Sequence, residues 1–245
     1  MKDVSVEITD QHVRKFSNGP LGYVRLNNEA NTYKQLKGLS SIPRVIDVAQ
    51  TTDTITLVME HVKGQSLRQL LDIQDQYTSR PIPWSRAKKH IQYYVAAEMS
   101  FLHANALYRD LNLDHIIFTN QKAVILDLES TIIGKNDTWT LRDTRGTWET
   151  MAPEEFMGYG TLTARTATYR AAIIAHQILT GQLPFKRFPH SRASTHAWRK
   201  RHPAEISSLL DTPTRRVFGA ALARNPTQRY KNPARFLEEL AKVIS

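Results

Sequence analysis

The sequence contains no cysteine, so it has neither disulfide bridges nor cysteine-ligated metal sites. A membrane-spanning helix needs about 20 consecutive apolar residues, and no run of that length occurs. The first residues alternate apolar and polar side chains and lack the apolar core of a signal peptide. These absences predict a cytoplasmic protein.

The 245 residues carry a formal net charge of +10, and 41% of them are hydrophobic. This content is enough for the core of one large domain or two small lobes. The positive surplus favours contact with anionic surfaces, but it forms no single tract and no DNA-specific motif. Its densest cluster, residues 192–202, includes Arg199, Lys200 and Arg201 beside Trp198, and we expect a solvated loop there.

Apolar patterning divides the chain in two. Residues 1–60 alternate as strands at 4–8, 12–16, 45–48 and 55–59, with a turn at 17–20 and a helix at 29–39. Residues 60–64 interrupt this pattern and form the expected hinge. Beyond it, helical spacing predicts helices from Ser66 and at 84–103, 169–179, 206–222 and 233–243, with a hairpin of 116–118 and 123–126. We therefore predict an α+β fold with a small strand-rich lobe, 1–60, and a larger helical lobe, 61–245.

Three motifs carry the chemistry. Residues 108–115 read Tyr-Arg-Asp-Leu-Asn-Leu-Asp-His, and Asp127 follows the apolar stretch 123–126. A carboxylate at the end of a buried strand is costly without a cation partner. Further on stand Gly146-Thr147 and Ala152-Pro153-Glu154. The set resembles the catalytic loop, metal-binding motif and activation-segment end of eukaryotic-type protein kinases, which implies a bilobal fold.

The resemblance implies roles for individual residues. Asp110 would orient the attacking hydroxyl, and Asp127 would bind magnesium on the phosphates of ATP. Lys15 matches the phosphate-binding lysine, and Glu29 matches the glutamate that orients it.

The hinge and the activation segment are matched as well. Met59 would border the adenine pocket, and main-chain groups of Glu60 and Val62 would bind adenine. Thr147 belongs to the segment that receives the substrate. The structural residues of the match are Arg109 and the pair Glu154 and Arg229. Arg109 would bind a phosphorylated activation segment, for which the candidates are Thr138, Thr140, Thr144 and Thr147.

Several positions depart from the family. Only 14 residues precede Lys15 and the first glycine is Gly19, so there is no room for a glycine-rich phosphate loop. His115 replaces an asparagine that binds a second metal, and Glu129 replaces a glycine and is a candidate metal ligand. Asn112 stands in place of a lysine on the transferred phosphate.

The remaining departures concern rigidity. Ala167 replaces an aspartate that anchors the catalytic loop, Ala172 replaces a glycine, and Tyr108 replaces a histidine. Support for Asp110 must therefore come from elsewhere.

The function that the resemblance implies is ATP-dependent phosphotransfer with Mg²⁺, or Mn²⁺ as an alternative, to a serine or threonine of a protein substrate. Two other readings stay open. The Arg-Asp-x-x-x-x-His pattern is similar to that of bacterial lipopolysaccharide-core sugar kinases, which gives a sugar acceptor. The missing glycine loop, Asn112 and Ala167 fit a non-catalytic kinase-like scaffold.

Overall fold

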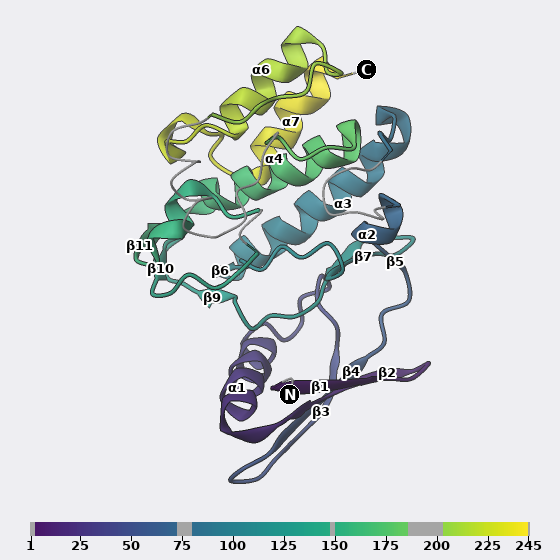
Figure 1. Cartoon of the computed structure of the whole chain (residues 1–245), viewed down its shortest axis with the longest axis vertical. Coiled ribbons are helices and arrows are strands. Elements are labelled where there is room, and N and C mark those ends of the chain that lie inside the picture. The colour runs from purple at the N-terminus through teal and green to yellow at the C-terminus, as the bar shows by residue number, and fades with distance from the viewer. Residues whose placement is uncertain (1–2, 73–79, 148–149, 186–202, 245) are drawn as a thin grey trace.

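The computed structural model describes residues 3–72, 80–147, 150–185 and 203–244. It shows a small lobe of strands around one helix and a larger lobe of stacked helices (Figure 1). This arrangement confirms the predicted α+β, kinase-like fold. The basic cluster at 192–202 lies outside the described residues.

The small lobe is a four-stranded antiparallel sheet with the order β1-β2-β4-β3. Its strands are β1 (Val4–Ile8), β2 (His12–Ser17), β3 (Val45–Gln50) and β4 (Ile55–Glu60). Lys15 on β2 lies opposite Leu57 on the central strand β4. Among the described residues, β1 is the only strand that precedes β2.

The helix of the small lobe differs from the prediction. Helix α1 (Gly19–Gln35) begins ten residues earlier than expected and ends earlier too, so the predicted turn at 17–20 leads directly into it. Gly19 has a φ of 72°, and proline follows at the start of the helix, where its missing N–H costs nothing. The first half faces solvent, with Leu21 60% and Val24 52% exposed, so it carries no apolar stripe for the sequence to show.

The larger lobe starts after residues 61–64, which connect β4 to β5. Its main helices are α3 (Trp84–His103), α4 (Ala164–Thr180), α6 (Thr212–Ala221) and α7 (Pro233–Val243). The shorter elements are β5 (Gln65–Ser66), α2 (Leu67–Leu70), β6 (Ala106–Leu107), β7 (Ile116–Phe118), β8 (Ala123–Ile125), β9 (Ile132–Ile133), β10 (Trp139–Leu141), η1 (Pro153–Met157), β11 (Gly160–Leu162) and η2 (Pro226–Gln228).

Two helix starts in this lobe correct the prediction. Helix α4 begins at Ala164 rather than 169, because the Thr163 side chain accepts a hydrogen bond from Arg165 N and caps it. Helix α6 begins at Thr212 rather than 206, because Asp211 accepts from Thr214 N. In both cases a polar cap, not the apolar pattern, sets the boundary.

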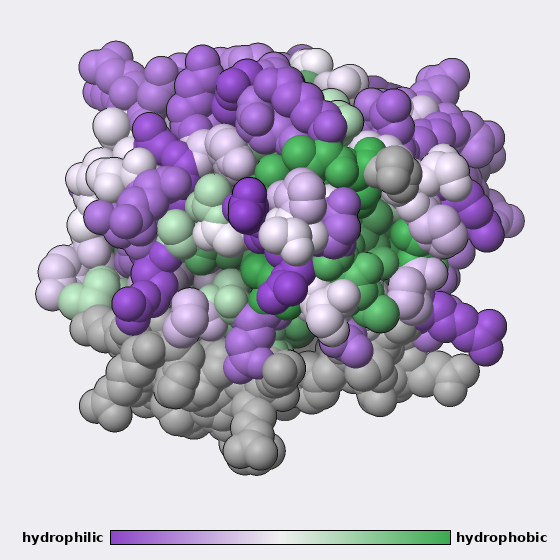
Figure 2. Space-filling view, turned by 90° about the horizontal axis from the view of Figure 1, so that it is seen from above, coloured by the Kyte–Doolittle hydropathy of each residue, from purple (hydrophilic) through white to green (hydrophobic). Residues whose placement is uncertain are grey.

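Helix α4 forms the centre of the large lobe. Every residue from Thr166 to Thr180 is buried, and α3, α6 and α7 pack around it. None of the described helices is both long and apolar enough to cross a bilayer. Figure 2 looks onto the end of this lobe, where apolar side chains near the centre of the view lie below a band of hydrophilic ones.

A buried ion pair joins η1 to the residue that follows η2. Arg229 Nη1 lies 2.8 Å from Glu154 Oε1, and Arg229 Nη2 lies 2.9 Å from Oε2. The Arg229 side chain is 0% exposed and its guanidinium stacks 4.6 Å from the ring centre of Tyr169. A guanidinium buried this fully depends on its counter-ion.

A second buried polar group is His176 on α4. Its Nδ1 lies 2.8 Å from the carbonyl of Gln182, and its Nε2 accepts from the N–H of Ser207 at 3.1 Å. These two contacts specify the neutral ring, which donates from Nδ1 and accepts at Nε2. Burial lowers the pKa of His176 to about 4, against the backbone bond to Gln182, which raises it.

We expect Glu154→Ala to lower the free energy of unfolding by about 3 kcal/mol, because it leaves the Arg229 charge buried without a partner. Urea unfolding followed by circular dichroism measures this. Glu238→Ala is the matched control, because it removes an exposed carboxylate that pairs with Arg235. Equal effects of the two substitutions would contradict a buried, structural role for Glu154.

The protein should also lose stability on acidification through His176. The histidine pKa is about 6.5 in the unfolded chain and about 4 in the folded one. The unfolded state therefore binds the extra proton between these values. Between pH 7 and pH 5 this histidine should lower the free energy of unfolding by about 2 kcal/mol. The stability of His176→Gln should fall less over the same range, and parallel pH profiles of the two proteins would refute the assignment.

Candidate active site

Three charged side chains meet where the lobes face each other. Lys15 Nζ lies 2.6 Å from Glu29 Oε1 and 3.9 Å from Asp127 Oδ2. Lys15 comes from β2, Glu29 from α1, and Asp127 from the loop that follows β8. The sequence predicted all three, and the structure brings Lys15 and Glu29 together with Asp127 from a distant segment of the chain.

Burial and charge act in opposite directions on this group. Burial raises the pKa of the Glu29 carboxyl to about 7, and the ammonium of Lys15 opposes the rise. Burial alone would lower the pKa of Lys15, but Glu29 and Asp127 outweigh it and raise that pKa. Lys15 therefore stays cationic. The Asp127 side chain is 29% exposed, so a solute can reach this carboxylate beside the Lys15 ammonium.

The backbone at Asp127 is strained. Its φ is 57°, in the left-handed region that residues with a side chain seldom adopt. The N–H of Glu129 donates to Asp127 Oδ1 at 3.3 Å and holds this turn. Strain of this kind persists where the surrounding structure fixes a side chain in one direction.

Asp110 is held from two sides. The hydroxyl of Tyr108 donates to its main-chain carbonyl, and the hydroxyl of Thr147 donates to Asp110 Oδ1 at 2.5 Å. A Cβ on Gly146 would lie 2.9 Å from the carbonyl of Arg109, so glycine permits the close approach that brings Thr147 to Asp110. These contacts support Asp110 although Ala167 carries no side-chain acceptor.

Arg109 is bound to the activation segment, and its predicted contact with a phosphorylated threonine stays a prediction. Its side chain is 1% exposed, and Nη1 binds Asp143 Oδ1 at 2.9 Å, while Nη2 binds the carbonyls of Asp143 and Arg145 at 3.2 and 2.9 Å. The guanidinium thus holds the activation segment through a carboxylate, not through one of the candidate threonines. Thr147, one of those candidates, gives its hydroxyl to Asp110 instead.

A line of alternating charges leads from Arg109 into the large lobe. Arg109 Nε lies 3.6 Å from Glu155 Oε1, and Arg170 Nη1 lies 3.1 Å from the same oxygen. Arg170 Nε lies 3.8 Å from Glu98, whose Oε1 accepts from the Tyr94 hydroxyl at 2.5 Å. Arg170 and Glu155 are both 0% exposed. Arg170 of α4 therefore anchors the catalytic loop through Glu155, which neither Ala167 nor Ala172 can do.

The metal ligands predicted from the sequence are not gathered in one place. Within the described ranges, no group of three or more His, Asp or Glu side chains could hold a metal ion. Glu129 is engaged by cations, since its Oε1 lies 2.9 Å from Arg25 Nε and 3.6 Å from Arg145 Nη1. His115 Nδ1 is buried and has no hydrogen-bond partner. Asp127 is thus the carboxylate placed best for a metal.

The hinge leaves a main-chain donor available. Met59 is 4% exposed at the end of β4. The N–H of Glu60 donates to Arg44 and that of His61 to Gln11, each at 3.0 Å. Val62 has no main-chain partner in the described part of the chain. A main-chain N–H without an acceptor is suited to binding a planar heterocycle.

Asn112 lies beside Asp110 and makes a local hydrogen bond: its Oδ1 accepts from the N–H of Asp114 at 3.0 Å. It lines a cavity of about 150 Å³ together with Thr147.

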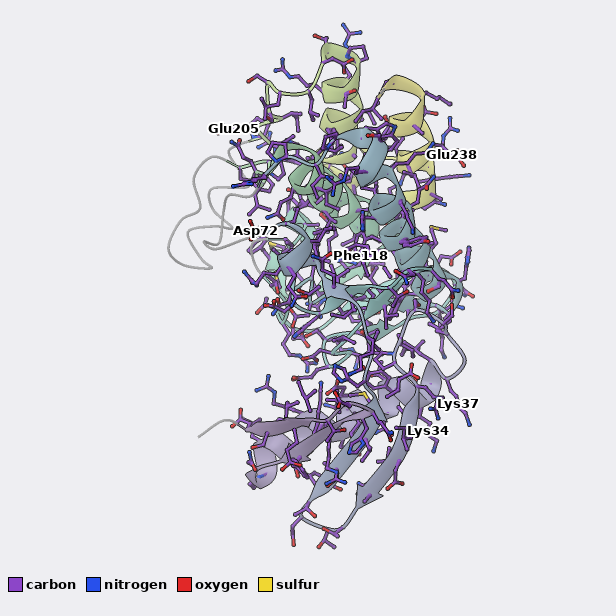
Figure 3. All side chains as sticks on the ribbon, turned by 90° about the vertical axis from the view of Figure 1, so that its right-hand side faces the viewer. Lys34, Lys37, Asp72, Phe118, Glu205 and Glu238 are labelled. Atoms are coloured by element: carbon purple, nitrogen blue, oxygen red, sulfur yellow. The ribbon has the colours of Figure 1, made fainter. Side chains whose placement is uncertain are left out.

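A larger cavity of about 700 Å³ lies elsewhere, next to the end of α1, where Lys34 and Lys37 line it (Figure 3). Neither Lys15 nor the aspartates line it, so its size does not make it the active site.

Sequence reasoning missed Asp143, Arg145 and Arg25. Asp143 Oδ2 lies 2.8 Å from Arg145 Nη2, and Arg25 links Glu129 to Asp3. The pairing of Arg109 with Asp143 spans 34 residues. The arginines around residues 142–145 were the only signal in the sequence, and they do not show which side chains would pair.

The geometry agrees with what comparison with known proteins shows. The protein kinase domain family matches residues 8–239. Serine/threonine-protein kinase PknB of Mycobacterium leprae is 26% identical over 100% of this chain and 39% of its own length. Mitogen-activated protein kinase kinase kinase 8 of Rattus norvegicus is 28% identical over 73% of this chain and 38% of its own length.

A further relative is serine/threonine-protein kinase pkn3 of Myxococcus xanthus, which is 27% identical over 89% of this chain and 42% of its own length. The chain thus spans about two fifths of the length of these curated relatives. The family match extends from β1 to α7 and includes every residue of the site. The chain belongs to the protein kinase domain family.

Proposed function

We propose that this domain transfers the γ-phosphate of ATP to a serine or threonine hydroxyl of a protein. The observation that carries the proposal is the meeting of Lys15, Glu29 and Asp127 across the cleft. The buried Lys15 ammonium is fixed between two carboxylates, which suits it to hold a phosphate. Use of ATP places the protein in the cytoplasm.

The site fits a magnesium-bound nucleotide. Magnesium keeps several waters and is held by one or two carboxylates together with the substrate's phosphates. Asp127 alone can therefore serve, with the unpartnered His115 Nδ1 as a further candidate ligand, which Mn²⁺ would accept more readily than Mg²⁺. Glu129 is less suited to this role, because Arg25 and Arg145 bind it. The metal would neutralise charge on the phosphates.

The chain's own residues then bind and orient the reactants. The main chain of Glu60 and Val62 binds adenine, with Met59 beside it. Lys15 binds phosphate oxygens and is itself aligned by Glu29. Asp110 accepts a hydrogen bond from the acceptor hydroxyl through Oδ2, since Oδ1 is occupied by Thr147.

The acceptor is a protein because Thr147 of the activation segment lies next to Asp110. Thr147 reaches Asp110, and Glu154 is fixed to Arg229 at the segment's end. This platform suits an extended polypeptide better than a sugar. Asn112 and Ala167 keep a non-catalytic scaffold as the alternative, and the same experiment separates the readings.

Incubation with labelled ATP, magnesium and a degenerate Ser/Thr peptide mixture should give phosphopeptides. Asp110→Asn and Asp127→Asn should each lower kcat by at least about 10³-fold, because one loses the orienting base and the other a charge on the metal. Asp53→Asn, in an exposed turn, is the control. Labelled glycolipid but no labelled peptide would favour the sugar reading, and no transfer at all would favour the scaffold.

We further expect activity that needs no phosphorylation of the activation segment. Burial would raise the pKa of Asp143, but Arg109 and Arg145 together lower it to about 2, so its charge is permanent at working pH. Asp143→Asn should lower kcat/KM about tenfold or more, because the buried Arg109 loses the closer of its two carboxylate partners. Asp143→Glu should restore part of the loss.

The measurement is steady-state kinetics on phosphatase-treated protein, with mass spectrometry to confirm that residues 138–147 are unmodified. Full activity of the treated wild type supports the role of Asp143. Loss of activity on treatment would show instead that a phosphothreonine is required.

A further inference from the structure

The cavity of about 700 Å³ beside the end of α1 has the size of a small-molecule site. It lies between α1, the strands β3 and β4, and residues of the segment 37–44. Its volume falls within the roughly 300–1,000 Å³ of sites that bind small ligands. Because the catalytic residues do not line it, a ligand there would bind apart from ATP and from the acceptor.

Much of the cavity wall is apolar. Ile42 and Ile55 are buried in the wall, and Leu39 and Val45 are half-buried. Val48 of β3 also lines the cavity and stays 41% exposed. Covering apolar surface of this kind releases water and is favourable. A ligand that fits the cavity therefore has an apolar body.

The charges around the cavity are mostly positive. The charged residues of its lining in the described part of the chain are Lys34, Lys37, Arg44, Lys122 and Glu60. Arg44 Nε lies 3.6 Å from the carboxylate of Glu60, so these two charges offset each other. Lys122 Nζ donates to the carbonyl of Ser40 at 2.6 Å. Among the residues that the structure describes, no ion pair engages Lys34 or Lys37.

The two unpaired lysines lie together at the end of α1 (Figure 3). The N–H of Lys37 donates to the carbonyl of Lys34 at 3.4 Å, which continues the last turn of the helix. The negative end of a helix carries roughly half an elementary charge, so it cannot offset two ammonium groups. A carboxylate has one oxygen for each of them. The cavity thus combines an apolar wall with a place for one anionic head.

One wall of the cavity is fixed to the large lobe. The carbonyl of Ser41 accepts from the N–H of Ile125 at 2.8 Å, and the hydroxyl of Ser41 lies 2.5 Å from that of Ser100. The bond from Lys122 to Ser40 is the third of these links. Residues 40–41 are therefore held by α3 and by the hairpin of β7 and β8.

Helix α1 forms the opposite wall. Glu29, which lies 2.6 Å from Lys15 Nζ, directly precedes Ala30 of the lining. A ligand that fills the cavity and binds the lysines contacts α1 and the fixed segment at the same time. It therefore favours the position of α1 in which Glu29 and Lys15 are paired.

We propose that this cavity binds a small monocarboxylate with an apolar body, and that the bound molecule holds α1 in the position that aligns Lys15. The apolar body lies against the walls formed by β3, β4 and the segment 37–44, and the carboxylate binds Lys34 and Lys37. The binding site does not depend on the proposed function. Its effect on phosphate transfer rests on that function, because Lys15 is the residue proposed to hold ATP.

Calorimetry with decanoate and with 1-decanol, which lacks the charge, tests the site. The wild type should bind decanoate about tenfold more tightly, as two partly exposed charge pairs would give. The double variant Lys34→Gln/Lys37→Gln should lose this preference. The matched control is Lys88→Gln/Lys89→Gln, which removes the same charge from exposed positions of α3 outside the cavity.

Equal affinities of the wild type for the two probes would overturn the site. Equal losses in the two double variants would also overturn it, because they would show attraction to the net charge alone.

The coupling to α1 is measured as the affinity for a fluorescent ATP analogue with magnesium. Decanoate should raise this affinity about fivefold in the wild type and leave it unchanged in Lys34→Gln/Lys37→Gln. Unchanged affinity in the wild type would overturn the coupling. Decanoate binding and coupling without any phosphate transfer would retain this inference and refute the proposed function.

Discussion

The guanidinium of Arg109 is the group on which the arrangement of the site depends. Arg109 is almost completely buried, so its positive charge requires anionic partners around it. Asp143 and two main-chain carbonyls of the activation segment meet it on one side, and Glu155 meets it on the other. Because Arg109 precedes Asp110 in the chain, the same contacts that neutralise it also fix the catalytic loop against the activation segment.

Charge alternation then connects the two lobes. On the small-lobe side, Arg25 of α1 joins Asp3 to Glu129, and Arg145 joins Glu129 to Asp143. The Lys15–Glu29 pair binds the same helix α1 to the sheet. Helix α1 therefore cannot move away from the cleft without separating several ion pairs. The partly exposed pairs are individually weak, and the strength of the connection lies in the buried ones.

The sequence allowed the fold and most of the site to be predicted, for identifiable reasons. Alternation at 55–59 and the helical stripe at 84–103 report burial directly, and motif order was enough to predict Lys15, Glu29, Asp110 and Asp127. The first half of α1 was missed because its apolar side chains face solvent. The partners of Arg109 depend on contacts between distant segments, which leave no local pattern.

The line of alternating charges from Arg109 through Glu155 to Arg170 has a consequence for genetic screens. In a screen for loss of function, substitutions of Glu98 on α3 or Arg170 on α4 would score with those of the cleft itself, although they touch no reactant. Second mutations that rescue such variants would restore a charge of the lost sign among the buried residues of these helices. A mutational map of this domain would thus show two separate clusters that share one phenotype.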